Sequence, residues 1–217
     1  MPALLTNPLQ SLLARLTPDA PRALIALAGL PGSGKSTLAA RLAAEVNAAL
    51  GPGTMAALGM DGFHLTKAAL RQMPDPEAAF ARRGAPWTFD VPALVSRLRE
   101  LREAAGRKWV GWPGFRHEIG DPIEGAQTVA PETRLILVEG LYLLYPEEGW
   151  GALGPLWDEC WYLDTSMEVA LERLTARHMS AWDLTRAEAA RRVAANDRLN
   201  AEIVARTRDF ADWRLAG

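Results

Sequence analysis

A glycine-rich turn between an apolar run and a helix-forming stretch constrains the fold of this 217-residue chain more than any other feature. The turn reads Gly29-Leu30-Pro31-Gly32-Ser33-Gly34-Lys35-Ser36. It follows a continuous apolar run, Ala23 to Ala28, which is typical of a parallel strand buried on both faces. It precedes Lys35 to Leu50, a stretch rich in Ala and Leu that predicts a helix of about four turns. The sequence therefore predicts a strand, a tight turn and a helix in direct succession.

The turn matches the pattern G-x-x-x-x-G-K-[ST], which cradles nucleotide phosphates when it joins a strand to a helix. Its glycines let successive backbone N–H groups point inward, and the following helix adds the positive end of its dipole. Lys35 is expected to reach the β- and γ-phosphates of ATP, and the Ser36 hydroxyl to bind Mg²⁺. The alternative, a glycine turn without a ligand, needs a chance match on the order of one in several hundred. The expected nucleotide-binding residues are Gly29, Gly32, Ser33, Gly34, Lys35, Ser36 and Thr37.

Strand and helix patterns alternate along the rest of the chain. Three further apolar stretches each end at an acidic residue: Met55 to Met60 before Asp61, Leu135 to Val138 before Glu139, and Cys160 to Leu163 before Asp164. A weaker strand is expected over 211–215, and helices over 8–16, over 91–105, from about 167, and from Thr185 past Asn200. This alternation predicts a three-layer α/β/α P-loop NTPase fold with a parallel sheet of about five strands.

We expect a single kinase-sized domain over 1–217, with a lead-in over 1–21 and a small helical lid at about 173–192. The segments 65–88 and 111–131 are rich in Pro and Gly and are expected to be long binding loops.

Charge and cysteine content exclude several classes of partner. The chain has 24 basic and 26 acidic residues, so its net charge of -2 gives no general attraction to nucleic acid or to an anionic membrane. Its single cysteine, Cys160, cannot form an intrachain disulfide and is expected at a buried strand position. No apolar run approaches the roughly 18 residues of a membrane span. These features predict a cytoplasmic protein whose partner is a small molecule.

Two strand-end carboxylates are candidates for the chemistry. Asp61 is expected across the phosphate site, where a carboxylate can accept the proton of an acceptor hydroxyl. The alternative role for Asp61 is that of a helix cap or a loop-fixing residue. Glu139 is expected near Mg²⁺, and its alternative is a solvated acid at the end of a strand.

Arg173 and Arg177 are four residues apart, so they share one face of the helix that follows Asp164. Two guanidinium groups over the triphosphate would stabilise charge on the transferring phosphoryl group. The alternative is an exposed basic face that pairs with Glu168 or Glu172. Four further arginines are expected to be mostly surface charge: Arg186, Arg191, Arg192 and Arg198.

The motifs together resemble the phosphoribulokinase/uridine kinase family, and the similarity spans about residues 22 to 215. The resemblance lies in the glycine-rich turn and, in the family's order, in Met60-Asp61-Gly62-Phe63-His64, Arg83 to Asp90, Pro113-Gly114-Phe115-Arg116-His117 and Val138-Glu139-Gly140. Within the family these segments look most like type I pantothenate kinase and the bacterial subgroup labelled "putative fructose or nucleoside kinase". Asn196-Asp197 with Asn200 also looks like that subgroup.

The resemblance implies ATP and Mg²⁺ as cofactors, Asp61 as the base, Glu139 near the metal, and Arg173 or Arg177 in the lid. It also implies that His64, Phe115 and His117 surround the acceptor, and it is compatible with a homodimer. The acceptor stays open between a sugar, a nucleoside and a pantothenate-like compound, because the loop residues depart from the patterns of uridine kinases. Should the acceptor be anionic, the nearest cations in the sequence are Arg82, Arg83 and Arg116.

The sequence therefore predicts an ATP-dependent phosphotransferase that acts on a hydroxyl of a small metabolite. The rival class is a P-loop ATPase with a regulatory or switch role and no small acceptor.

Overall fold

The structure, a computed structural model, covers residues 2–17, 19–116 and 119–217. Its main sheet has six strands in the order β1-β8-β7-β2-β6-β3, and every neighbouring pair is parallel. The strands are β1 (Ala3–Leu4), β2 (Ala23–Gly29), β3 (Met55–Gly59), β6 (Leu135–Gly140), β7 (Glu159–Asp164) and β8 (Trp213–Ala216). The four strong predictions and the weak one are confirmed, and the short β1 is an additional strand.

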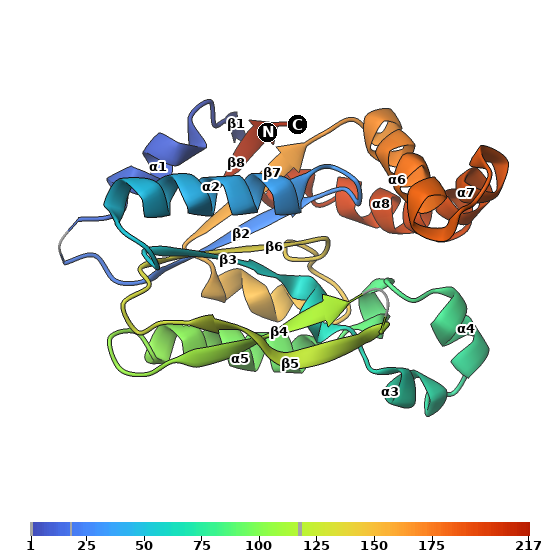
Figure 1. Cartoon of the computed structure of the whole chain (residues 1–217), viewed down its shortest axis with the longest axis horizontal. Helices are drawn as coiled ribbons and strands as arrows, with labels where there is room; N and C mark the ends of the chain where they lie inside the picture. Colours follow the sequence, from blue (N-terminus) through green and yellow to red (C-terminus); the bar gives the residue numbers. More distant parts are fainter. Residues whose placement is uncertain (1, 18, 117–118) are drawn as a thin grey trace.

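Helices cover both faces of the sheet, which gives the three-layer α/β/α P-loop NTPase fold predicted from the sequence (Figure 1). Alternate residues of β2 point to opposite sides, because Leu24 and Ala26 belong to one hydrophobic cluster while Ile25 and Leu27 belong to the other. Each cluster excludes water from one face of the sheet, so the parallel strands are buried on both faces. The helices are α1 (Pro8–Ala14), α2 (Lys35–Leu50), α3 (Lys67–Arg71), α4 (Pro76–Ala81), α5 (Val91–Glu103), α6 (Met167–Trp182), α7 (Arg186–Arg192) and α8 (Arg198–Ala205).

Helix starts follow the capping residues of the sequence. The Asp90 carboxylate accepts a hydrogen bond from Ala93 N at the start of α5, and Ser166 caps α6 in the same way. Thr185 forms a capping box with Glu188 at the start of α7. The helix predicted from Thr185 past Asn200 is interrupted by a π-helical segment, Val193–Asp197. Such π-helical turns occur frequently at functional sites.

The prediction of a long loop over 111–131 is wrong. The described part of this segment contains two antiparallel strands that form a hairpin, β4 (Val110–Arg116) and β5 (Asp121–Val129), with a register shift between Trp112 and Gly114. The hairpin is stabilised by tertiary packing, because the Trp112 side chain is fully buried and its indole N–H donates to the Gly59 carbonyl over 2.9 Å. The segment 65–88, also expected to be a loop, contains the short helices α3 and α4.

Cys160 lies on β7 as predicted, but its side chain is half-buried rather than fully buried. No helix among the described residues is long and apolar enough to cross a membrane.

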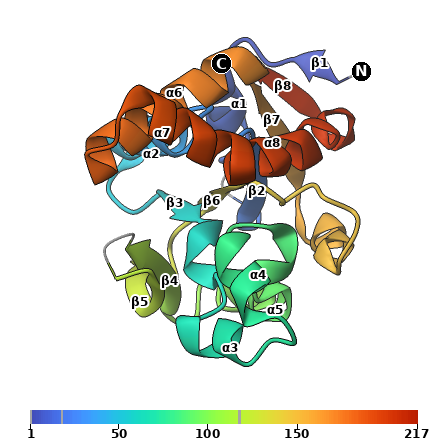
Figure 2. The ribbon, with the colours of Figure 1, turned by 90° about the vertical axis from the view of Figure 1, so that its right-hand side faces the viewer.

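The carboxyl end of the sheet lies between two groups of elements. Figure 2 shows α6, α7 and α8 on one side of this edge and α3, α4 and the β4–β5 hairpin on the other. A cavity of about 830 Å³ opens between them.

Candidate active site

Three neighbouring strands bring the predicted catalytic groups to one edge of the sheet. In the β2-β6-β3 order, Glu139 of β6 is in register with Leu27 of β2 and with Gly59 of β3. The glycine-rich turn follows β2 directly, and Asp61 comes two residues after Gly59. The turn, Glu139 and Asp61 therefore all line the same cavity, at the edge where parallel α/β sheets bind ligands.

The glycine-rich turn has the backbone conformation that its residues predict. Gly34, the N-cap of α2, has a φ of 97°, which residues with a side chain rarely adopt. A Cβ on Gly32 would lie only 2.4 Å from the Ala170 carbonyl oxygen of α6, so the turn packs directly against that helix. Five of the predicted nucleotide-binding residues line the cavity: Gly32, Gly34, Lys35, Ser36 and Thr37. The other two, Gly29 and the buried Ser33, are not among the lining residues.

Lys35 is buried, Glu139 is half-buried, and the charges of the two side chains act on one another. Burial is the main cause that lowers the pKa of Lys35, while Glu139 and Asp61 raise it and Arg177 lowers it further. Burial also raises the pKa of Glu139, and the charge of Lys35 opposes that effect. In this structure Lys35 Nζ donates to the Leu30 carbonyl oxygen over 2.9 Å. The ammonium group is thus held at the mouth of the turn, close to both carboxylates.

Ser36 and Glu139 together fit a magnesium site. The Ser36 hydroxyl donates to Glu139 Oε1 over 2.8 Å, so one hydroxyl and one carboxylate lie side by side next to the turn. Mg²⁺ in such sites typically takes one or two protein carboxylates and fills its other positions with water and phosphate oxygens. Within the described ranges no group of three or more His, Cys, Asp or Glu residues could hold a metal. Water and phosphate oxygens would complete the coordination of an ion held by these two residues.

Asp61 lies on a 3₁₀ turn, Met60–Phe63, and its side chain is exposed in the cavity. Its backbone carbonyl is 2.8 Å from His64 Nδ1, and because a carbonyl only accepts, His64 carries a proton on Nδ1. The carboxylate itself takes no part in this bond. It is thus available to a molecule in the cavity.

Arg173 and Arg177, the arginines predicted to lie in the lid, face the cavity from α6. Both line the cavity, and Arg173 Nη1 donates to the Ser33 carbonyl in the glycine-rich turn over 3.2 Å. The alternative pairing with Glu172 does not form, because Glu172 pairs with Arg186 at 2.8 Å. The helix face that carries Arg173 and Arg177 therefore points to the cavity.

We expect Arg173→Ala and Arg177→Ala each to lower kcat with a smaller change in the KM for ATP. Each guanidinium would act mainly on charge that develops during transfer, and loss of such a group typically costs ~10²-fold or more. Steady-state kinetics at varied ATP test this. Arg186→Ala is the control, since it removes a guanidinium exposed on the same lid and paired to Glu172. Unchanged kinetics in both cavity variants would contradict a role for this face.

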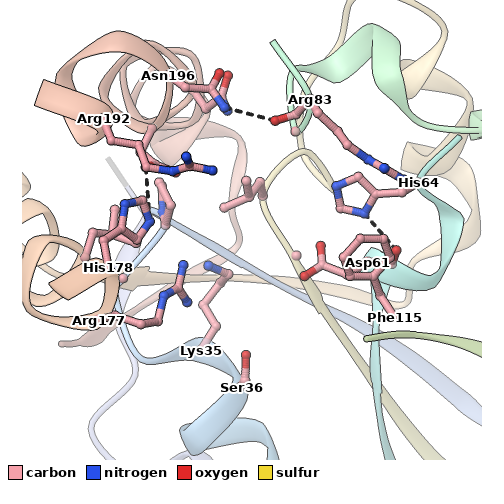
Figure 3. A pocket seen from close by; sticks show the side chains of 18 of the residues that line it. Lys35, Ser36, Asp61, His64, Arg83, Phe115, Arg177, His178, Arg192 and Asn196 are labelled. Carbon is pink, nitrogen blue, oxygen red and sulfur yellow. Dashed lines mark hydrogen bonds and ion pairs between the residues drawn. The ribbon is translucent and has the colours of Figure 1, made fainter. Parts of the chain in front are cut away.

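A second group of residues, from α6 and α7, also lines the cavity and was not predicted from the sequence. Arg192, expected to be surface charge, lines the cavity with its guanidinium carbon 4.2 Å from the centre of the Trp182 ring. Trp182 in turn contacts His178 edge-on, at 4.6 Å between ring centres. Figure 3 shows Arg192 and Arg177 on either side of His178. Arg192 reaches the cavity because α7 folds back onto α6, and the spacing of residues along a helix does not reveal such a contact.

His178 is a buried residue of α6 that contacts the π-helical segment. Burial lowers the pKa of His178 to about 4, and the charges of Arg177 and Arg192 lower it too. Its Nε2 lies 3.5 Å from Asp197 Oδ2, and burial raises the pKa of Asp197. At neutral pH the contact is therefore a polar contact of a neutral imidazole rather than an ion pair.

The opposite wall of the cavity is a set of packed rings and one arginine. His64 lies against Phe89 at 4.0 Å and against Phe115 at 4.6 Å between ring centres. The Arg83 guanidinium carbon lies 5.5 Å from the centre of the Phe115 ring. These aromatic rings pack largely on one another, and all four residues line the cavity.

One of the residues predicted for the acceptor, Arg116, is not in this wall. Arg116 is exposed at the end of β4 and is not among the residues that line the cavity. His117 lies outside the described residues. Arg82 does not face the acceptor either, since it binds the side chains of Asn196 and Asn200. The two asparagines do line the cavity, as their presence in the family-like motif suggested.

A sequence model of the phosphoribulokinase/uridine kinase family matches residues 24–209. The chain is 40% identical over 184 residues to "Putative uridine kinase C227.14" of Schizosaccharomyces pombe, an alignment that covers 84% of this chain and 78% of that protein. It is also 40% identical over 153 residues to "ATP-dependent kinase-like protein notR'" of Aspergillus versicolor, covering 69% of this chain and 88% of that one.

A solved structure agrees with these sequence matches. The crystal structure described as a "putative fructose transport system kinase" from Silicibacter sp. TM1040 superposes with a TM-score of 0.84 and 36% sequence identity. The superposition covers 95% of this chain and 96% of that one. The similarity therefore includes the elements on both sides of the cavity.

Proposed function

The chain belongs to the phosphoribulokinase/uridine kinase family, and we propose that it transfers the γ-phosphate of ATP to a hydroxyl of a sugar or sugar-like polyol. Membership of this family makes it a phosphotransferase with a hydroxyl acceptor. A nucleoside is our second choice of acceptor and a pantothenate-like compound our third. We place the lid at about 173–192, within α6 and α7.

One observation carries the proposal: the Asp61 side chain is exposed in the cavity that the glycine-rich turn also lines, and its carboxylate forms no hydrogen bond or ion pair with any described residue. A carboxylate in that position can accept the proton of a hydroxyl as the hydroxyl attacks the phosphoryl group. Its neighbour His64 is fixed by the bond of Nδ1 to the Asp61 carbonyl. The packing of His64 between Phe89 and Phe115 favours hydrogen bonds over ring stacking as the means of binding the acceptor.

The remaining residues would hold and neutralise the phosphates. Lys35 lies at the mouth of the turn, and Arg173 and Arg177 approach it from α6, so three cations surround the expected path of transfer. Ser36 and Glu139 would hold Mg²⁺, which when bound neutralises phosphate charge. Because these groups are already in place, catalysis rests on positioning and electrostatics.

The acceptor is identified by measuring ADP release from ATP at fixed Mg²⁺ with ketohexoses, pentoses, nucleosides and pantothenate. A site built to bind hydroxyls strongly rejects analogues that lack them. We therefore expect one compound to stimulate ADP release far more than the others, and we expect that compound to be a sugar. Strong ADP release with uridine or pantothenate and none with any sugar would overturn that order. No stimulation by any acceptor would favour the rival class, a regulatory ATPase.

A further inference from the structure

We infer that the acceptor carries an oxyanion, as in a carboxylate or a phosphate ester, and that Arg83 binds it. This inference rests on the proposed kinase function and narrows the class of acceptor. It thus selects a polyol with an anionic group over a neutral sugar.

Of the three arginines near the acceptor in sequence, only Arg83 is placed to contact it. Arg82 donates to Asn196 Oδ1 over 2.8 Å and to Asn200 Oδ1 over 3.1 Å, so its guanidinium is committed to the π-helical segment and α8. Arg116 is exposed outside the cavity. Arg83 lines the cavity from the wall opposite the lid (Figure 3).

The Arg83 guanidinium is fixed but incompletely paired. Its Nη2 donates to the Leu65 carbonyl over 2.8 Å, and its side chain is only 17% exposed. Its Nε is buried without a hydrogen-bond partner, and Nη1 makes no hydrogen bond with any residue in the described part of the chain. A partly desolvated cation held in this way is strongly stabilised when an anionic partner binds to it.

Among the described residues, the carboxylate that lies near Arg83 is that of Asp121, and it does not supply that partner fully. Asp121 Oδ1 lies 3.5 Å from Arg83 Nη2, which is long for a charged hydrogen bond. The same oxygen accepts a shorter bond, 2.7 Å, from the backbone N–H of Lys67 at the start of α3. Asp121 therefore serves mainly to fix α3 against the hairpin, and Arg83 keeps binding capacity for a ligand.

The position of Arg83 also fits the chemistry at Asp61. Contacts run from Asp61 to His64, from His64 to Phe115, and from Phe115 to Arg83. An oxyanion bound at Arg83 would be separated from the Asp61 carboxylate by this pair of rings, which limits repulsion between the two negative charges. The acceptor should therefore carry its reactive hydroxyl and its anionic group several bonds apart.

Matched pairs of compounds test the inference. Fructose 6-phosphate with fructose, gluconate with glucitol, and pantothenate with pantothenyl alcohol differ chiefly in the anionic group. We expect the anionic member of at least one pair to bind at least about tenfold more tightly to the chain loaded with Mg²⁺ and a non-hydrolysable ATP analogue. Calorimetry measures this binding, and ADP release with ATP gives the KM. Equal or weaker binding of the anionic member in all three pairs would overturn the inference.

Arg83→Gln should remove this preference by raising the Kd of the anionic member about 10- to 100-fold, with little change for the neutral member. Arg99→Gln, an exposed arginine of α5 outside the cavity, is the matched control and should change neither. Should Arg83→Gln fail to fold in a thermal unfolding assay, Arg83→Lys takes its place, because an ammonium cannot reproduce the forked contact. An unchanged preference for the anionic member in a folded Arg83 variant refutes the assignment.

The two proposals fail in different ways. If the loaded chain binds an anionic compound through Arg83 but no acceptor stimulates ADP release, the kinase proposal fails while the anion site stands. If a sugar is phosphorylated, but its anionic counterpart binds no more tightly and Arg83→Gln changes the binding of neither, the kinase proposal stands and the anion site fails.

Discussion

Lys35→Ala is expected to lower phosphoryl transfer by ~10²- to 10³-fold or more while the chain stays folded. Lys35 is buried at the mouth of the glycine-rich turn, where its charge faces Glu139 and Asp61. A preorganised cation in such a low-dielectric site stabilises developing phosphate charge far more than a cation in water. The measurement is the rate of ADP formation with the best acceptor, alongside a thermal unfolding curve.

The control for this variant is Arg41→Ala, which removes a cation from the same helix, α2, but from its exposed face outside the cavity. It should keep the rate of the unaltered chain. Near-normal transfer by a folded Lys35→Ala protein would refute the assignment of the phosphate site.

Asp61→Asn is expected to lower phosphoryl transfer by roughly 10²- to 10⁴-fold and to leave nucleotide binding nearly unchanged. Asparagine keeps the shape of the side chain but cannot take a proton from the acceptor hydroxyl. Single-turnover transfer and the Kd of an ATP analogue, measured on the same protein, separate the two effects.

Asp90→Asn is the matched control, since Asp90 caps α5 from outside the cavity and Asn caps a helix as well as Asp does. Loss of nucleotide affinity together with substantial residual transfer in Asp61→Asn would identify Asp61 as a metal-binding or structural residue instead.

The sequence predicts the phosphate half of the site well, because local rules determine it. The turn between β2 and α2, Glu139 near the end of β6, Asp61 just after β3, and the arginine pair on α6 all follow from motif, strand end and helical spacing. The adjacency of β2, β6 and β3 then brings them together through ordinary parallel pairing. The assigned roles of these residues stay predictions until the variants are measured.

The acceptor half was less predictable because tertiary contacts determine it. Prolines and glycines in 111–131 indicate a loop, yet burial of Trp112 and its bond to Gly59 hold a hairpin there. Likewise, nothing in the spacing of Arg192 shows that it stacks on Trp182, since this depends on the turn at Asp183, a residue with a φ of 50°. The quoted Asn196-Asp197 motif was the one local signal that this region belongs to the site.

The order of strands has a consequence for how such enzymes acquire a new acceptor substrate. The turn and Glu139 lie at the carboxyl ends of β2 and β6, and Asp61 lies two residues beyond β3. His64, Arg83 and Phe115 all come after Asp61, in the stretch of chain that leads to β6. With the roles proposed above, the groups that handle phosphate and the groups that select the acceptor lie in separate segments of the chain. Exchange of the 64–129 segment between relatives, or mutation within it, could redirect the enzyme to a new metabolite and leave the phosphate-handling groups untouched. Acceptor diversity is therefore expected to arise in this segment.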